Sequence, residues 1–217
     1  SAKEAPTGWL VETAGKGVRR RIACRQLIDC TGGADIVGMI GLARLREEEI
    51  QPGTLIFAFG NYDKNRLDAE RIDQRYRQAL AAGTLHEGDY CHAGGHFVNF
   101  LRGGGTNAQH IFGADSSTSA THTQANLAGR ASVLRLLRFI RSLPGCEAAR
   151  LLKMQTETAV RETYRIAGEA QITVDDYTSG RLFDDAVGHS FYPIDLHDRH
   201  GVQPAPLRRG VVPTIPL

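Results

Sequence analysis

The spacing of apolar residues predicts two amphipathic helices in a chain that otherwise consists of short strands and loops. The longer helix is expected over 121–143, where aliphatic residues between positions 133 and 140 recur at the interval that brings them to one face. The other is expected over 65–82, with an arginine-rich polar side and Gly83 at the position of a C-terminal cap. Each helix should therefore bury one stripe and expose the opposite one.

Shorter elements follow from alternation and from turn residues. Residues 9–13 and 18–23 should form a hairpin around a Gly-Lys-Gly turn, and 173–180 should form one or two helical turns opened by a capping box. Residues 34–40, which follow a Thr-Gly-Gly turn, are expected to form a short apolar helix. Further strands are expected over 26–30, 53–59, 96–102, 109–112 and 156–166.

Composition changes this picture mainly by exclusion. A net charge of +2 over 217 residues does not create the field that favours nucleic acid or an anionic membrane as a partner. Apolar runs span only a few residues, so no membrane-spanning helix is expected. Four sparse cysteines without a Cys-x-x-Cys pair suit a reducing compartment, and the expected location is the cytoplasm.

A group of histidines between positions 86 and 122 raises the question of a metal site, because neutral imidazole is a common zinc ligand. His92 and His96 are separated by Ala-Gly-Gly, and the two glycines disfavour the helix that would bring both rings to one side. We therefore expect no metal, and histidines that line a cleft or lie on loops. A metal enzyme built on this cluster is the less favoured alternative, in which His92→Ala or His96→Ala would abolish function.

Two arginines form a second candidate for chemistry. If residues 156–166 are a strand, Arg161, Thr163 and Arg165 fall on one face. The two guanidinium groups could then bind a carboxylate or phosphate of a ligand, or could pair with acidic residues further along the chain. The residues alone leave both readings open. The glycine runs of the chain do not complete a Gly-x-Gly-x-x-Gly motif, so no nucleotide-binding loop is identified.

Four segments together carry a resemblance to a known family. They read Leu-Ile-Asp-Cys-Thr-Gly-Gly-Ala-Asp at 27–35, Pro-Gly-Cys-Glu at 144–147, Arg-Glu-Thr-Tyr-Arg-Ile-Ala-Gly-Glu at 161–169 and Tyr-Pro-Ile-Asp-Leu-His at 192–197. In order and spacing they resemble the FAD-dependent oxidoreductases that have two dinucleotide-binding domains and a large inserted substrate domain. The resemblance covers nearly the whole chain, and the segment at 161–169 is its most specific part.

The resemblance implies roles for particular residues. The first segment would pass near the adenosine and pyrophosphate side of the flavin, and its glycine turn has a glycine where the family commonly has an aspartate. The implied cofactor-binding residues are Thr31, Gly32, Gly33 and Asp35. The last two segments would lie toward the substrate side of the isoalloxazine. The implied catalytic residues are Arg161, Arg165 and His197.

The expected fold is α+β, with a mainly antiparallel sheet and packed helices as a substrate domain in residues 42–217, beside a remnant of an α/β FAD-binding domain in residues 1–41. The glycine-rich phosphate-binding unit that opens such flavoproteins is not found, nor is the flavin segment that closes them. We therefore interpret the chain as the middle portion of a longer enzyme. FAD is expected as the cofactor of the full-length protein, not held by this chain alone.

The leading hypothesis is a substrate-side fragment of an FAD-dependent oxidoreductase that passes a hydride from an organic substrate to the flavin and is inactive when isolated. Its expected partners are a small-molecule substrate and the remainder of the flavin domain. Apolar residues between 27 and 40 should be exposed and favour self-association. The alternative is a non-catalytic ligand-binding or interaction module on the same scaffold.

Overall fold

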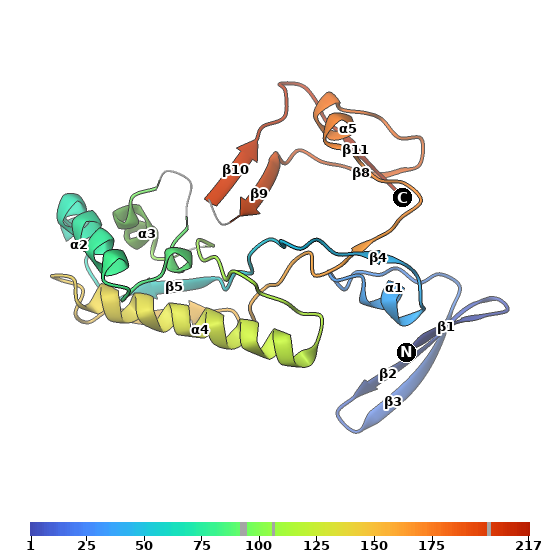
Figure 1. Ribbon diagram of the computed structural model, residues 1–217, viewed down its shortest axis with the longest axis horizontal. Helices are drawn as coiled ribbons and strands as arrows, with labels where there is room; N and C mark the ends of the chain where they lie inside the picture. The colour runs from blue at the N-terminus through green and yellow to red at the C-terminus, as the bar shows by residue number, and fades with distance from the viewer. Residues whose placement is uncertain (92–94, 106, 199–200) are drawn as a thin grey trace. The chain divides into compact units, whose positions relative to one another are not determined.

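Two compact units make up the chain, Ser1–Ala167 and Gly168–Leu217. The computed structural model describes residues 1–91, 95–105, 107–198 and 201–217, and Figure 1 labels most of their helices and strands. The elements of the first unit are β1 (Ala2–Ala5), β2 (Gly8–Gly15), β3 (Val18–Cys24), α1 (Asp35–Met39), β4 (Arg44–Leu45), β5 (Phe57–Gly60), the 3-10 turn η1 (Lys64–Arg66), α2 (Ala69–Ala81), the 3-10 turn η2 (Glu87–Asp89), α3 (Phe97–Gly103), α4 (Ser119–Arg141), β6 (Arg150–Met154) and β7 (Arg165–Ile166). Those of the second unit are α5 (Val174–Ser179), β8 (Ala186–His189), β9 (Ile194–Asp198), β10 (Gly201–Ala205) and β11 (Thr214–Pro216).

The first three strands form an antiparallel sheet in the order β1-β2-β3. β2 and β3 pair from Trp9↔Cys24 to Gly15↔Val18, which confirms the predicted hairpin. In its turn Gly17 has a φ of 71°, a backbone conformation that glycine adopts at no steric cost.

The two amphipathic helices are confirmed with sharper boundaries than the sequence predicts. α4 begins after Thr118, whose hydroxyl accepts a hydrogen bond from the amide of Thr121 at 3.1 Å while the Thr121 hydroxyl accepts one from the amide of Thr118. α2 starts at Ala69, later than expected, because Asp68 caps it and the preceding residues form the separate turn η1. Gly83 follows the helix with a φ of 68°, as expected of a C-terminal cap.

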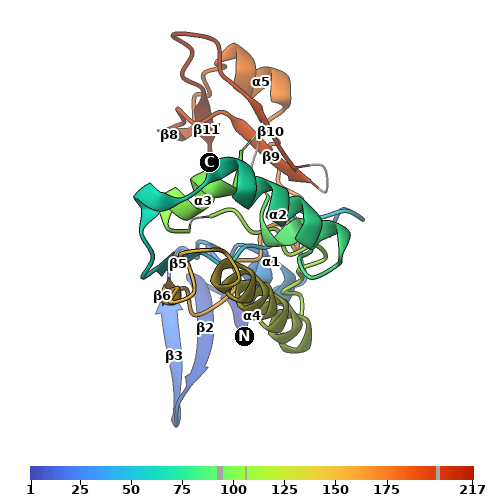
Figure 2. The same cartoon turned by 90° about the vertical axis from the view of Figure 1, so that its left-hand side faces the viewer.

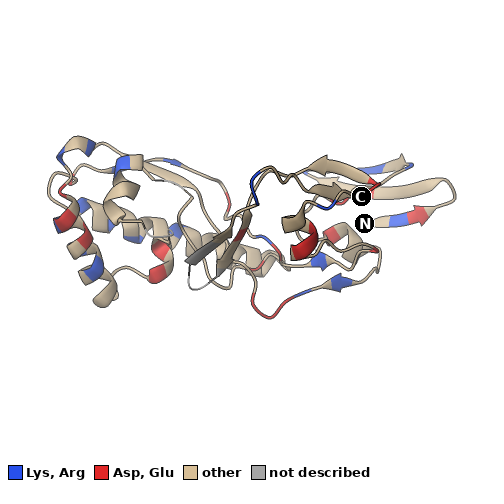
Figure 3. Cartoon of the chain, turned by 90° about the horizontal axis from the view of Figure 1, so that it is seen from above, with Lys and Arg blue, Asp and Glu red and all other residues tan. Residues whose placement is uncertain are grey.

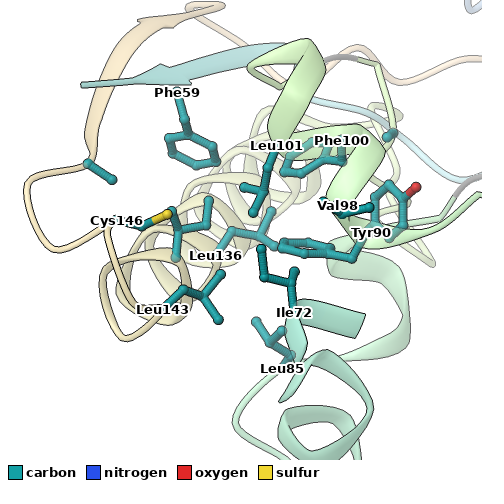
Figure 4. Packing of buried hydrophobic residues seen from close by; sticks show 14 of the residues in the cluster. Phe59, Ile72, Leu85, Tyr90, Val98, Phe100, Leu101, Leu136, Leu143 and Cys146 are labelled. Carbon is teal, nitrogen blue, oxygen red and sulfur yellow. The ribbon is translucent and has the colours of Figure 1, made fainter. Parts of the chain in front are cut away.

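A cluster of apolar side chains joins β5, α2, α3 and α4 and forms the hydrophobic core of the first unit (Figure 4). Leu136 of α4 and Leu101 of α3 are completely buried in it. The rings of Phe57, Phe59 and Phe100 meet at tilted or edge-to-face angles, with centroids 5.1 to 6.3 Å apart. Figures 1 and 2 show these helices gathered around β5. Burial of this apolar surface is the main source of stability here.

The strand expected over 96–102 is wrong, because these residues form the helix α3. Phe97, Phe100 and Leu101 recur at helical spacing, and all three are buried in the core cluster. The helix ends at Gly104, which has a φ of 80°. A strand would have turned part of this apolar set toward water.

The strand expected over 26–30 is also wrong. The carboxylate of Asp29 turns toward the next loop and accepts hydrogen bonds from the amides of Thr31 and Val37, at 3.0 and 3.1 Å. Ile28 is 80% exposed, so no neighbouring strand covers this segment. Local hydrogen bonds outweigh the β-propensity of the residues.

The continuous strand expected over 156–166 is wrong as well. β6 ends before this segment, and β7 covers only its last two residues. Glu162 has a φ of 62°, which interrupts the extended backbone. Arg161, Thr163 and Arg165 therefore do not share a face: Thr163 is 2% exposed, whereas both arginines lie at the surface.

The remaining predicted strands of the first unit are reduced in length. Of the strand expected over 53–59, β5 keeps only the last part, and Gly53 forms an isolated bridge with Ile111. That bridge is also the only strand-like pairing of the described residues 109–112. The chain around these positions is instead ordered by side-chain hydrogen bonds, including one from the amide of Leu55 to the buried amide oxygen of Gln109.

Helices together with small antiparallel sheets confirm the α+β class. The expected single main sheet is corrected, because the described strands form five separate sheets of two or three strands each. The contacts divide the chain after Ala167, a division that leaves the expected domain boundary after residue 41 untested.

The second unit consists of α5 and two small sheets, β8-β11 and β9-β10. The predicted capping box is confirmed, because Thr173 and Asp176 bond reciprocally to each other's backbone amides. A hydrogen bond from Arg181, followed by those from Thr173, lowers the pKa of Asp176 to about 2.

Charged residues of both signs are interspersed along the elements of the chain (Figure 3). Among the described residues, the helices are all too short or too polar to cross a bilayer.

Candidate functional site

A groove of about 720 Å³ in the first unit brings together residues far apart in the sequence. One wall is the loop that opens α1, and the other is the chain that follows β6. The described lining residues are Thr31, Asp35, Ser116, His122 and the segment Met154–Val160. Two of the four residues implied to bind the cofactor therefore face this groove.

Asp29 organises the loop wall of the groove. Its carboxylate accepts hydrogen bonds from the amide and the hydroxyl of Thr31, at 3.0 and 2.7 Å, and from the amide of Val37. Thr31 in turn accepts a hydrogen bond from the amide of Asp35 at 2.8 Å. Burial alone would raise the pKa of Asp29, but the hydrogen bonds from Thr31 and Val37 outweigh it and lower the pKa.

The backbone of this loop takes unusual conformations. Gly32 has a φ of 79°, which explains a glycine at this position. Ala34 also lies in the left-handed region, with a φ of 53°, immediately before α1. Gly33 is buried, and an added Cβ there would lie 3.3 Å from the carboxylate of Asp35. The missing side chain at Gly33 thus leaves room beside Asp35.

The opposite wall is held by α4. The amide of Thr158 donates to the side chain of Asn126 at 2.6 Å, and its hydroxyl donates to the backbone oxygen of Ala125 at 3.1 Å. An added Cβ at Gly129 would lie 2.4 Å from the Thr158 hydroxyl, so the close approach of this wall to α4 requires glycine. The guanidinium of Arg130 donates to the backbone oxygen of Thr156. The wall is therefore fixed to a rigid helix.

An imidazole and a carboxylate meet within the groove. His122, in the first turns of α4, has its Nε2 atom 3.5 Å from Oε2 of Glu157. The side chain of His122 is 33% exposed, and that of Glu157 is 69% exposed. Such a pair can hold a proton on the ring nitrogen that faces the carboxylate.

Arginines behind the groove are occupied by ring and carboxylate contacts. Arg44 lies over the ring of Tyr164, with Cζ 3.9 Å from the ring centroid, and Nη1 is 3.9 Å from Oδ1 of Asp35. Arg46 lies 5.2 Å from the same centroid and bonds to Asp115 at 3.2 Å. Hydrogen bonds with Tyr164 and then with Asp115 raise the pKa of Arg46.

Asp115 precedes Ser116, a lining residue of the groove, and both are partly buried. Burial would raise the pKa of Asp115, but hydrogen bonds from Ser117 and the charge of Arg46 lower it. Ser116 shares a hydrogen bond of 2.8 Å between its hydroxyl and that of the buried Thr163. The segment around 161–166 therefore contacts a lining residue of the groove through Thr163, not through its arginines.

Of the three residues implied to be catalytic, the two in the first unit, Arg161 and Arg165, are not among the lining residues of the groove. Arg165 forms an ion pair with Glu47, and Arg161 is exposed. His197 belongs to the second unit, where its Nε2 atom lies 3.2 Å from Asp195. Their catalytic roles stay predictions.

The histidine cluster can be followed only in part, because His92 lies outside the described residues. His96 bonds through Nδ1 to the nearly buried carboxylate of Asp73 at 2.6 Å. Within the portion of the chain that the structure describes, no three His, Cys, Asp or Glu side chains are placed to hold a metal ion.

Sequence reasoning missed Asp29, Arg44, Tyr164 and the His122–Glu157 pair. A signal existed only for Asp29, since an aspartate two residues before a threonine at the start of a turn favours a local side-chain hydrogen bond to the backbone. The other contacts join positions more than 30 residues apart, and local pattern does not encode them.

Comparison with known proteins gives one match. A family model described as FAD dependent oxidoreductase matches residues 2–217. No curated protein and no solved structure matches the chain.

Proposed function

The chain belongs to the FAD dependent oxidoreductases, and from this membership we propose that its groove is where flavin and substrate meet in a hydride-transfer enzyme. General flavin-dependent oxidoreductase function follows from the family. The finer assignment rests on one observation: Thr31 and Asp35, which the resemblance implies to contact the cofactor, line the same groove.

The chemistry of the groove fits the hydroxyl-bearing part of FAD. Carboxylate and hydroxyl groups, such as those of Asp35 and Thr31, bond well to the hydroxyls of a ribityl or ribose chain. Lys and Arg are not among its described lining residues, so it offers no cation for the pyrophosphate. We propose that the groove takes the hydroxyl-bearing part of FAD and that other residues of the enzyme hold the pyrophosphate.

When bound, FAD supplies the acceptor for a hydride from the substrate. The chain's own residues would orient the substrate and handle its proton. We assign the proton to His122: with the proton of Nε2 directed to Glu157, Nδ1 can accept one from a substrate hydroxyl or amine. The carboxylate of Glu157 would then stabilise the imidazolium that forms.

Arg161, Arg165 and His197 remain proposed residues for an anionic group of the substrate. Arg161 and Arg165 lie at the surface and are accessible to such a group, although Arg165 would have to exchange its contact with Glu47. We place the two arginines second to the groove because neither of them lines it.

Exposed apolar residues beside the flavin-side loop are a candidate contact surface for the remainder of the flavin domain. Ile28, Met39 and Leu42 flank the flavin-side loop and are 80%, 60% and 61% exposed. We propose that the remainder of the flavin domain covers them, and that the isolated chain self-associates through them. Light scattering should detect oligomers of the parent chain. The double variant Ile28→Ser/Met39→Ser should be monomeric, and a monomeric parent chain would contradict the proposal.

A titration with FAD tests the proposed function. Quenching of flavin fluorescence should show weak, saturable binding to the chain, and Asp35→Asn should weaken it about tenfold, the loss expected for one charge-assisted hydrogen bond. Asp184→Asn, which changes an exposed carboxylate of the second unit, is the matched control and should bind like the parent. Equal affinity of Asp35→Asn and parent, or no saturation with a folded chain, would reject the proposal.

The alternative is a ligand-binding module that kept the scaffold without redox work. Nothing in the groove favours it over the enzyme. The two differ in a measurement on the full-length protein, because a module would bind its ligand there without any reduction of flavin by candidate alcohols or amines.

A further inference from the structure

One arginine, Arg44, joins α1 to the segment that carries Tyr164. The guanidinium of Arg44 lies on the face of Tyr164 with Cζ 3.9 Å from the ring centroid. It also lies 3.9 Å from the carboxylate of Asp35. The side chain of Arg44 is only 26% exposed, so both contacts are partly shielded from water.

The third contact of Arg44 is with Gly38, which lies in α1 like Asp35. An added Cβ at Gly38 would lie 2.3 Å from Cζ of Arg44, so the guanidinium occupies the space beside this glycine. The flavin-side loop, residues 29–34, leads directly into α1. A single side chain thus ties the loop and its helix to the segment that carries Tyr164.

Backbone pairing fixes the base of this arginine. β4 pairs with β7 through Arg44↔Ile166 and Leu45↔Arg165, which sets Arg44 opposite the residues that follow Tyr164. Arg46, two residues further along, approaches the same ring at 5.2 Å and is anchored by Asp115. The ring of Tyr164 is consequently held by guanidinium groups that are themselves held by carboxylates.

We propose that Tyr164 is a positioning residue for the flavin-side loop: its ring face holds Arg44 against Gly38 and Asp35, and so sets the orientation in which Asp35 and Thr31 line the groove. This inference rests on the proposed function for its consequence, the affinity for FAD. The placement of the loop is a property of the protein alone and is measured separately.

Three variants test the contacts of Arg44 with Tyr164 and α1. Tyr164→Leu removes the ring, and Tyr164→Phe keeps the ring face but removes the hydroxyl that bonds to Arg46. Gly38→Ala leaves Tyr164 intact and displaces Arg44, whose flexible end can move away at little cost. The measurements are the amide signals of residues 31–35 and the Nε–H signal of Arg44 in ¹⁵N-labelled full chain, the melting temperature, and the affinity for FAD.

Tyr164→Leu and Gly38→Ala should shift the loop signals and the Arg44 signal. They should weaken FAD binding about fivefold, the range of a partly shielded cation–π contact, with a melting temperature near that of the parent. Tyr164→Phe should match the parent in the loop signals and in affinity, because the ring face is retained. This rescue by the conservative variant separates positioning from a general loss of packing.

Unmoved loop signals in Tyr164→Leu would overturn the inference, as would a Tyr164→Phe variant that behaves like Tyr164→Leu. Shifted loop signals with unchanged FAD affinity would overturn its link to the cofactor. If the parent binds no FAD, the proposed function fails, while the loop signals still decide whether Tyr164 positions the loop.

Discussion

The core cluster and the loop before α1 are ordered by different forces, although both belong to the first unit. In the core, side chains such as Leu136 and Leu101 are completely buried, and their removal from water stabilises α2, α3 and α4 together. In the loop, Ile28 is exposed, and the carboxylate of Asp29 replaces apolar burial as the organising contact.

The difference teaches where precision and stability reside. Apolar packing is strong in total but tolerant of direction, whereas hydrogen bonds are directional and individually contribute little. A loop held in this way can present Thr31 and Asp35 in a defined geometry while adding little to the stability of the fold. It also depends on each of its few partners.

The largest effect should come from the core. Leu136→Ala should destabilise the chain by about 3 kcal/mol, because it removes a completely buried side chain and leaves a cavity. Leu134→Ala, on the same helix but at a position that is 50% exposed, is the control and should change stability little. Urea unfolding measures both, and equal losses for the two variants would contradict the assignment of the core face of α4.

A smaller loss is expected in the loop. Asp29→Ala should cost about 1 kcal/mol of stability, yet it should greatly increase amide hydrogen exchange at Thr31 and Val37, which lose their acceptor. The core amides of α4 should keep their protection. Protection at Thr31 that survives the substitution would show that the backbone, and not Asp29, orders the loop.

The smallest effect is expected at low pH, where contacts made by aspartates should be lost while the core stays folded. The pKa of Asp29 is lowered and that of Asp176 is about 2 in the folded chain, so both contribute stability above the ordinary range of aspartate, near pH 3.9. That contribution is lost as the pH falls through the folded-state values. NMR signals of the α5 cap should therefore change between about pH 4 and pH 2, and those of the loop should change as the pH falls below the ordinary pKa of aspartate. Asp176→Asn should remove the change at α5 alone; simultaneous loss of core signals would refute the separation.

Periodicity predicted the elements whose burial pattern is local. α4 and the hairpin β2–β3 follow directly from apolar spacing and from a glycine turn. α3 was missed because its phenylalanines and valine favour strands in isolation, and only the surrounding core shows that the helical spacing of Phe97, Phe100 and Leu101 is the one that is buried.

The site was predictable to a smaller extent. The resemblance identified Thr31 and Asp35 but not the residues of the opposite wall of their groove. It also identified Arg161 and Arg165, but not the positive φ of Glu162, which interrupts the strand expected to place the two arginines on one face. A positive φ at a non-glycine residue depends on the surrounding fold and cannot be predicted from the residue type.

By itself the sequence determined the chemistry that is available: the helices that must bury one face, the turns, and the family to which the motifs belong. Tertiary structure alone decided which groups meet. It set His122 beside Glu157, and it set Arg44 against Tyr164, Asp35 and Gly38. The physical reason is that contacts over long sequence separation arise from the packing of whole elements, whose combined burial outweighs the preference of any single residue.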